Sequence, residues 1–293
     1  MNRYISVFLF LIHAFILPFT HILSATASTT QEFLIIYSGN LLAELKPCGC
    51  AKEEDQGGIE RRMQYLQDIR KNNPNILLVD TGDHFKEPTR QGKLKAETLL
   101  KATEKMEYDA VALGERDLVY GSQFLKKYSI PFISSNIDLE DFTLEKSRVK
   151  KLKNGIKIAV LSVVDPSLFY LKNHAGLKIP HPNQILSQEI SRIRNSNSID
   201  FLVLLTHMEK KESLKYLKKN GVDIVINGHI FSETDIVDMK PIQEIDKIFL
   251  QASPRGQKMG ELRLIINEAG KISFKHRMVR LDSSINNDPE MVK

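Results

Sequence analysis

The chain has 293 residues, of which 42% are hydrophobic and 26% charged, with a formal net charge of +5. This is the composition of an ordinary globular protein that is long enough to bury one substantial core. The lysines are scattered and form no basic stripe interleaved with aromatic residues, which argues against a nucleic-acid-binding protein.

The N-terminus has the anatomy of a secretory signal peptide. Residues 1–4 are positively charged, residues 5–19 are apolar, and Ala25-Thr26-Ala27 supplies small residues at a cleavage-site spacing. The apolar stretch is short for a bilayer span of about 20 residues, although an uncleaved anchor is the alternative. We therefore expect an exported, periplasmic or extracellular protein, with a signal peptide over 1–27, one domain over 28–293 and no stable membrane span after cleavage.

Strand and helix patterns alternate through the first two thirds of the mature chain, and strands dominate the last part. Short apolar runs rich in β-branched residues predict buried strands, and apolar spacings of three and four predict helices. The predicted strands are 33–37, 76–80, 110–113, 131–135, 157–164, 201–205, 222–226, 249–252, 261–266 and 272–279. The predicted helices are 59–71, 94–106, 124–128, 182–196 and 211–219. A turn over 267–271 joins the last two strands as a hairpin, and we expect the tail, 283–293, to be disordered.

Four polar pieces each follow an apolar run, and each offers a metal-binding side chain: Asp83, Glu115, His207 and His229. Ligands collect outside the carboxyl ends of the strands in an α/β sheet, so we expect these side chains to converge. Two carboxylates and two imidazoles suit zinc, manganese or iron. Taken singly, each piece has a simpler explanation, since Gly-Asp is common in turns and a histidine after a strand is common in loops.

The only two cysteines, Cys48 and Cys50, lie in a loop after the first predicted strand. A disulfide across a single residue closes a strained ring, so a structural bridge is not expected. The remaining interpretations are a metal-binding thiolate pair, a redox pair beside the metal cluster, and an exposed surface loop.

Several of these motifs together resemble the calcineurin-like metallophosphoesterases, and most closely the catalytic domain of the 5′-nucleotidase and UDP-sugar hydrolase group. The resemblance covers about residues 33–281 and rests on the pieces Gly57-Gly58-Ile59-Glu60-Arg61-Arg62, Leu77-Leu78-Val79-Asp80-Thr81-Gly82-Asp83, Tyr108-Asp109-Ala110-Val111-Ala112-Leu113-Gly114, Ser134-Ser135-Asn136 and Val222-Asp223-Ile224-Val225-Ile226-Asn227-Gly228-His229. It implies an α/β fold, the four-layer α/β/β/α sandwich with two central sheets.

The resemblance also implies a site for two metals, of which this sequence keeps one. Asp83 matches the family's bridging aspartate, His207 and His229 match histidine ligands of the second metal, and Glu115 replaces an asparagine. We therefore expect one divalent ion. Cys48 and Cys50 resemble a divergent branch in which a Cys-Gly-Cys loop accompanies loss of first-metal ligands, so they are further candidate ligands.

The first-metal ligands of the family are absent. Its opening Asp-x-His is Ser38-Gly39-Asn40 here, and its last histidine is Phe231. Arg116 stands in place of the catalytic histidine. These departures predict weak or altered hydrolysis.

Arg116 and Asp117 are the candidate catalytic residues, and Asn40 and Asn136 the candidate substrate-binding residues. The first functional hypothesis is a metal-dependent hydrolase of a small phosphorylated molecule, in which Arg116 binds phosphate bidentately. The alternative is a non-hydrolytic metal and thiol protein, using Cys48 and Cys50 with a redox partner.

Overall fold

The computed structural model describes residues 30–47, 55–169, 176–231 and 237–291. The predicted signal peptide and both cysteines lie outside these ranges. Within them, no helix combines the length and the apolar character that crossing a bilayer requires.

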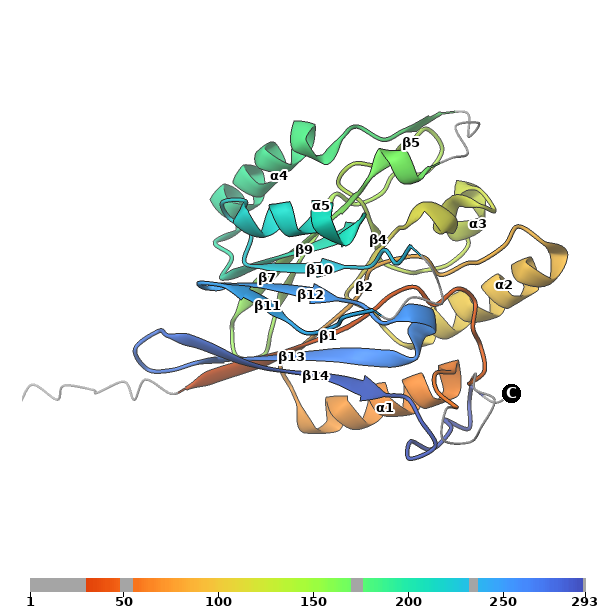
Figure 1. The fold of residues 1–293 in the computed structure, drawn as a ribbon, viewed down its shortest axis with the longest axis horizontal. Helices are drawn as coiled ribbons and strands as arrows, with labels where there is room; N and C mark the ends of the chain where they lie inside the picture. The colour runs from red at the N-terminus through yellow and green to blue at the C-terminus, as the bar shows by residue number, and fades with distance from the viewer. Residues whose placement is uncertain (1–29, 48–54, 170–175, 232–236, 292–293) are drawn as a thin grey trace, which may run out of the picture.

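Two six-stranded sheets form the centre of the molecule (Figure 1). The first has the order β14-β13-β1-β2-β3-β4 and the second the order β11-β12-β10-β9-β7-β6. The strands of the first sheet are β1 (Gln31–Ser38), β2 (Ile76–Asp80), β3 (Ala110–Ala112), β4 (Phe132–Ile133), β13 (Lys258–Ile266) and β14 (Ile272–Arg280). Those of the second are β6 (Ser147–Lys151), β7 (Lys157–Val164), β9 (Phe201–His207), β10 (Ile224–Asn227), β11 (Ile242–Glu244) and β12 (Lys247–Gln251).

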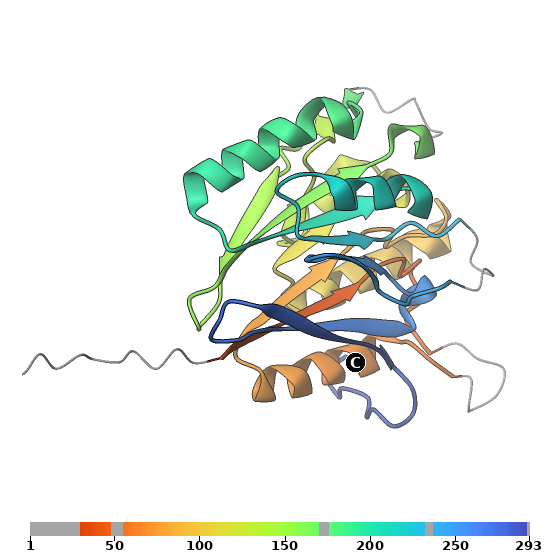
Figure 2. The same ribbon diagram turned by 60° about the vertical axis from the view of Figure 1, so that its left-hand side comes forward.

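Helices cover the outer face of each sheet, as Figures 1 and 2 show from two sides. The first sheet packs against α1 (Ile59–Asn72) and α2 (Arg90–Lys105), and the second against α4 (Pro182–Asn197) and α5 (Lys210–Lys215). The smaller elements are η1 (Glu115–Leu118), α3 (Ser122–Leu125), β5 (Asp138–Leu139), η2 (Pro166–Leu168), β8 (Leu177–Lys178), η3 (Tyr216–Lys218) and η4 (Pro254–Gly256). This confirms the predicted four-layer α/β/β/α sandwich.

The β1 strand shows how the sequence pattern produces the layers. Phe33, Ile35 and Tyr37 point between the two sheets, whereas Leu34 and Ile36 face the helices. A strand covered on both faces needs apolar residues at every position, and this is why β1 is a continuous apolar run rather than an alternating one.

Four strands were not predicted from the sequence. Strands β5 and β8 are only two residues long, and β6 and β11 are polar edge strands without an apolar run. The described part of the tail, 283–291, contacts the rest of the domain: Asp288 is 2% exposed and accepts a hydrogen bond from Gln67 of α1. Ile285 and Met291 pack against the core on the same side.

Parallel strand pairing determines where the site lies. In the first sheet β1, β2, β3 and β4 are parallel, and in the second β7, β9, β10 and β12 are parallel. The carboxyl ends of β2 and β3 therefore lie on one edge of their sheet, as do those of β9 and β10.

Candidate metal centre

The four predicted ligands converge where the two sheets meet. Asp83, Glu115, His207 and His229 each offer one ligand atom, and these atoms all lie within 4.8 Å of one another. Asp83 follows β2 and Glu115 follows β3, whereas His207 ends β9 and His229 follows β10. Each sheet thus contributes two side chains, which come from four separate strand ends.

The orientation of His207 suits a metal ligand. Its Nδ1 lies 2.9 Å from the carbonyl oxygen of Thr81 and donates to it, which leaves Nε2 as the ring's lone-pair atom. That Nε2 lies 2.8 Å from Glu115 Oε2 and 3.4 Å from Asp83 Oδ2. A lone pair so close to two carboxylates requires a cation between them, either a proton or a metal ion.

The electrostatics of the cluster also favour a bound cation. Burial by itself lowers the pKa of His207, but the carboxylates of Asp83 and Glu115 outweigh it and raise that pKa well above its usual value. Burial raises the pKa of Asp83, whereas for Glu115 the two histidines overcome burial and lower the pKa. With the ring proton of His207 on Nδ1, the buried atoms Glu115 Oε2 and His229 Nε2 have no hydrogen-bond partner among the described residues. A divalent ion would satisfy both atoms, so the residues present fit a metal.

The loops that carry the ligands approach each other closely. Asp83 adopts a left-handed backbone conformation with φ 60°. Gly114 faces it, and a Cβ on Gly114 would lie 2.2 Å from Asp83 Oδ1 and 2.7 Å from His207 Cε1. Glycine is needed at this position because any side chain would overlap the ligands.

Arg116 lies beside the cluster and is partly exposed to solvent. Its side chain is 32% exposed, and its Nε is 3.6 Å from Asp83 Oδ2 and 3.9 Å from Glu115 Oε1. Its backbone N–H donates to Asp83 Oδ1 at 3.1 Å. A guanidinium in this position can reach both the ligand carboxylates and an anion that approaches from solvent.

Asp117 lies behind the cluster, away from solvent. Its side chain is fully buried, and it accepts hydrogen bonds from the backbone N–H groups of Asp83, His84 and Gly114. His84 Nδ1 lies 3.0 Å from the same carboxylate. Both oxygens of Asp117 are therefore engaged by the protein itself.

The two predicted substrate-binding asparagines are also engaged internally. Asn136 is fully buried, donates to the carbonyls of Val164 and Pro180, and accepts from the backbone N–H of Val164. Asn40 donates to the carbonyl of Gly228. The geometry thus gives Asn136 a role in joining two backbone segments, because both ends of its amide are already bonded to backbone groups.

The positions that the family resemblance assigns to a first metal hold no ligand set among the residues described. Ser38 donates to Asp80 at 2.5 Å, and its hydroxyl lies 3.0 Å from that of Tyr108. Phe231 is 81% exposed. Cys48 and Cys50, the other predicted ligands, lie outside the described residues.

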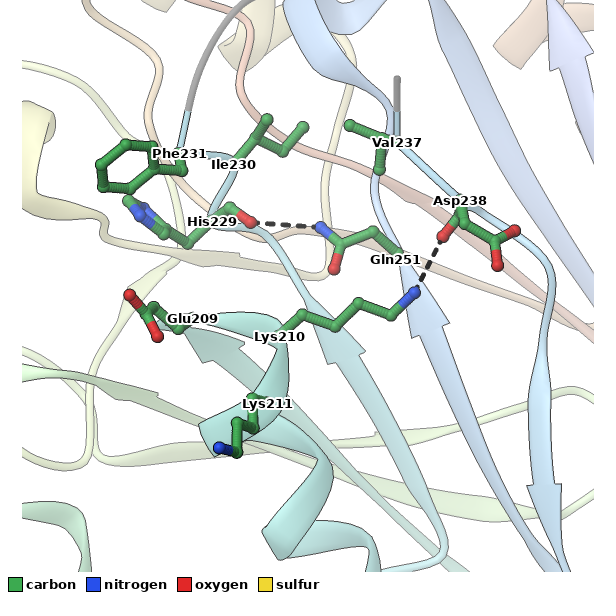
Figure 3. A pocket seen from close by; sticks show the side chains of 9 residues that line it. All are labelled: Glu209, Lys210, Lys211, His229, Ile230, Phe231, Val237, Asp238 and Gln251. Atoms are coloured by element: carbon green, nitrogen blue, oxygen red, sulfur yellow. Dashed lines mark hydrogen bonds between the residues drawn. The ribbon is translucent and has the colours of Figure 1, made fainter. Parts of the chain in front are cut away.

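A cavity of about 430 Å³ opens beside His229. In Figure 3 the apolar side chains of Ile230, Phe231 and Val237 lie on one side of it. The charged residues at the start of α5 lie on the other side, and Lys210 donates to the carbonyl of Asp238. Because His229 lines both the cavity and the cluster, a ligand bound at the metal centre has room to extend here.

Sequence reasoning missed two residues of the centre, His84 and Asp80. His84 lies between two carboxylates, with Nδ1 3.0 Å from Asp117 Oδ1 and Nε2 3.3 Å from Asp80 Oδ1. The only signal in the sequence was that Asp80 and His84 flank Asp83 after the same apolar run.

The sequence matches the family described as calcineurin-like phosphoesterase over residues 20–232. The chain belongs to this family. It is 25% identical over 264 residues to a 5′-nucleotidase of Homo sapiens, a match that covers 80% of this chain and 46% of that protein. The chain thus spans about half the length of the curated relatives it matches.

Solved structures show the same fold. A 5′-nucleotidase precursor from Thermus thermophilus superposes with a TM-score of 0.77 at 17% identity, over 89% of this chain and 57% of that one. The calcineurin-like phosphoesterase YfkN from Bacillus subtilis superposes with a TM-score of 0.69 at 19% identity, over 90% of this chain and 95% of that one. At these identities the similarity concerns the fold.

Proposed function

We propose that this protein is an exported, 5′-nucleotidase-related phosphoester hydrolase that holds a single divalent ion and hydrolyses its substrate weakly. The observation that carries the proposal is the convergence of Asp83, Glu115, His207 and His229, in which two buried ligand atoms lack a hydrogen-bond partner among the described residues. Family membership supports phosphoester chemistry, and the N-terminal sequence supports export. Zinc, manganese and iron are all compatible with this ligand set.

The four ligands would hold the ion by two imidazole nitrogens and two carboxylate oxygens. A bound divalent ion polarises phosphoryl oxygens and lowers the pKa of water. The Thr81 carbonyl keeps His207 in the required tautomer. Ser38 and Phe231 stand at positions where the family has ligands of the first metal, and we assign neither of them a ligand role. We therefore propose one ion rather than two.

Arg116 is the residue we assign to substrate. Its guanidinium lies beside Asp83 and Glu115 and remains partly exposed, so it can donate to two phosphoryl oxygens at once as they approach the cluster. Arginine stays protonated and supplies no proton to the leaving group. General acid catalysis typically contributes about 10²–10⁴-fold. Hydrolysis should therefore be slower by about that factor than in a relative that has the catalytic histidine.

We assign Asp117 and Asn136 no direct role toward substrate, because their polar atoms are already bonded to backbone groups. The organic part of the substrate has room in the cavity beside His229. The alternative function, a non-hydrolytic metal and thiol protein, would use Cys48 and Cys50 together with the same ion. Both cysteines lie outside the described residues.

The test combines ion content with turnover of a generic phosphomonoester, 4-nitrophenyl phosphate. We expect wild-type protein to bind about one equivalent of Mn²⁺, Zn²⁺ or Fe²⁺ and to hydrolyse the ester slowly. His229→Ala should lower ion content, and Arg116→Ala should raise KM while the ion stays bound. Asp141→Asn is the matched control, since Asp141 is an exposed carboxylate that bonds Ser122 and Gln123.

Three results would overturn the proposal. The metal centre fails if wild-type protein binds none of the three ions. The hydrolase assignment fails if the ion binds but Asp83→Asn leaves turnover unchanged. Two equivalents of ion per chain would refute the single-ion centre.

A further inference from the structure

The loops after β2 and β3 are joined by one buried carboxylate. Asp117 Oδ2 accepts the backbone N–H of Asp83 at 2.8 Å and that of Gly114 at 2.7 Å. Asp83 is itself a candidate metal ligand. Gly114 directly precedes Glu115, which is the other candidate carboxylate ligand. Asp117 therefore sets the distance between the two candidate carboxylate ligands through backbone hydrogen bonds, without bonding to the side chain of either ligand.

The other oxygen of Asp117 is held by His84. Asp117 Oδ1 accepts the backbone N–H of His84 at 2.8 Å and lies 3.0 Å from His84 Nδ1. On its other side, the imidazole Nε2 of His84 lies 3.3 Å from Asp80 Oδ1. Asp80 in turn accepts the hydroxyl of Ser38 and the backbone N–H of Gly82. Asp80, His84 and Asp117 thus form a buried row of acid, imidazole and acid.

The hydrogen bonds of this row fix Asp117 in one orientation. Its two oxygens accept the backbone N–H groups of Asp83, His84 and Gly114, and His84 Nδ1 lies 3.0 Å from Oδ1. Because these donors belong to the loops after β2 and β3, a buried carboxylate that accepts all of them also fixes the two loops relative to each other.

Asp83 needs this support because its backbone is strained. Its φ of 60° lies in the left-handed region, which residues other than glycine seldom adopt. The N–H of Asp83 is held by Asp117, and its Oδ1 accepts the N–H of Arg116. Such conformations persist only where the surrounding structure over-determines them.

We propose that Asp117 and His84 are positioning residues for the metal centre, which act by holding the Asp83 and Glu115 loops at the separation that one ion requires. This inference rests on the proposed function, since it concerns the same centre. It gives Asp117 a role different from the catalytic one that its sequence position suggested. It also gives a role to His84, which contacts no ligand side chain in the row.

The test measures Co²⁺ binding to the full chain by calorimetry and by the visible absorption of the bound ion. Asp117→Asn replaces one acceptor oxygen with a donor and should weaken Co²⁺ binding by about 10–100-fold, the usual effect of a partner behind a metal ligand. His84→Gln retains a donor toward one carboxylate but cannot bridge both, so it should weaken binding in the same direction. Both variants should shift the Co²⁺ absorption spectrum, because the ligand geometry changes.

Glu261→Gln is the matched control. Glu261 is also a buried acid with charged and hydroxyl partners, Arg277 at 2.7 Å and Tyr65 at 2.8 Å, and these lie outside the centre. The Glu261→Gln substitution should lower thermal stability, whereas the Co²⁺ affinity and the Co²⁺ absorption spectrum should remain those of wild type. If Asp117→Asn does not fold, His84→Gln decides the question.

The outcomes separate the two proposals. No Co²⁺ binding by wild-type protein refutes the metal centre itself. Wild-type affinity and spectrum in a folded Asp117→Asn or His84→Gln variant refute the positioning role alone. An equal loss of affinity in Glu261→Gln also refutes it, because the effect would then reflect general destabilisation.

Discussion

The four ligand side chains differ in how far solvent reaches them. His207 is 1% and Asp83 3% exposed, whereas His229 is 8% and Glu115 15% exposed. The inner pair is also held by bonds to Thr81 and Arg116, so its orientation is set before any ligand arrives. We therefore expect a ligand to reach the cluster from the side of Glu115 and His229, because the cavity opens beside His229.

A histidine outside the centre, His276, makes folding stability depend on pH. It lies on β14, and the hydroxyl of Tyr37 is 2.9 Å from its Nε2. Burial lowers the pKa of His276, so the folded state favours the neutral ring. Below the usual histidine pKa of about 6.5, the unfolded chain binds the proton more readily. The stability that the neutral ring contributes is thus present above that pH and is lost as pH falls through the folded-state pKa.

We therefore predict that the free energy of unfolding of His276→Gln decreases less than that of wild type as the pH is lowered. Urea unfolding of wild type and variant between pH 7.5 and 5 measures this, and the difference between the two proteins should shrink toward the acid end. Parallel stability curves over this range would show that His276 does not carry the effect.

At the scale of elements, two hairpins show where the backbone is relaxed and where it is strained. The turn between β13 and β14 places Gly270 at φ 75°, with open space among the described residues where its Cβ would be. The turn between β11 and β12 places Ile245 at φ 54°, and this side chain is 88% exposed. A β-branched residue is poorly suited to a positive φ, and exposure offers it no compensating contact.

Ile245→Gly is therefore expected to stabilise the protein by about 1 kcal/mol, because glycine adopts positive φ without the steric cost. For a chain of this size that corresponds to an increase in Tm of about 2–4 °C. Gly270→Ala is the matched variant in the other hairpin. It introduces a side chain at a positive φ and should lower Tm by a similar amount. A thermal melt of each checks both, and a lower Tm for Ile245→Gly would contradict the strain argument.

At the scale of the whole molecule, the four candidate metal ligands come from both halves of the sandwich. Asp83 and Glu115 follow strands of the first sheet, and His207 and His229 belong to strand ends of the second. An ion bound by all four connects the sheets at the edge where their strands end. Binding to the folded state alone stabilises a protein by RT ln(1 + [L]/Kd), about 2.7 kcal/mol at 100 times Kd.

We accordingly predict that Co²⁺ at 100 times its Kd raises the Tm of wild-type protein by roughly 5–10 °C. His229→Ala should reduce this shift strongly, and a chelator should reverse it in wild type. Lys215→Ala is the control, since Lys215 is an exposed partner of Glu212 on α5. A Tm independent of the ion in wild type would mean that the ion does not connect the sheets.

Much of the fold and the four ligands were predictable from local patterns. Continuous apolar runs such as 201–205 predict strands buried on both faces, and a sheet of parallel strands brings their carboxyl ends together. These runs are followed within a few residues by Asp83, Glu115, His207 and His229, so the convergence of the four side chains is a consequence of topology. The edge strands β6 and β11 lack that signal, because only one side of them pairs and their residues are polar.

The sequence by itself determined the layers, the family and which side chains reach the common edge, because these depend on hydrophobic periodicity and on residue order. Only the tertiary structure decided what the neighbouring polar residues do. Asp117 and Asn136 point inward to backbone groups, and His84 lies between Asp80 and Asp117. Partners such as Asn136 and Val164, or Asp83 and Asp117, lie about 30 residues apart in the chain. A buried carboxylate or amide must find partners wherever the packed chain provides them, and no local sequence pattern encodes that choice.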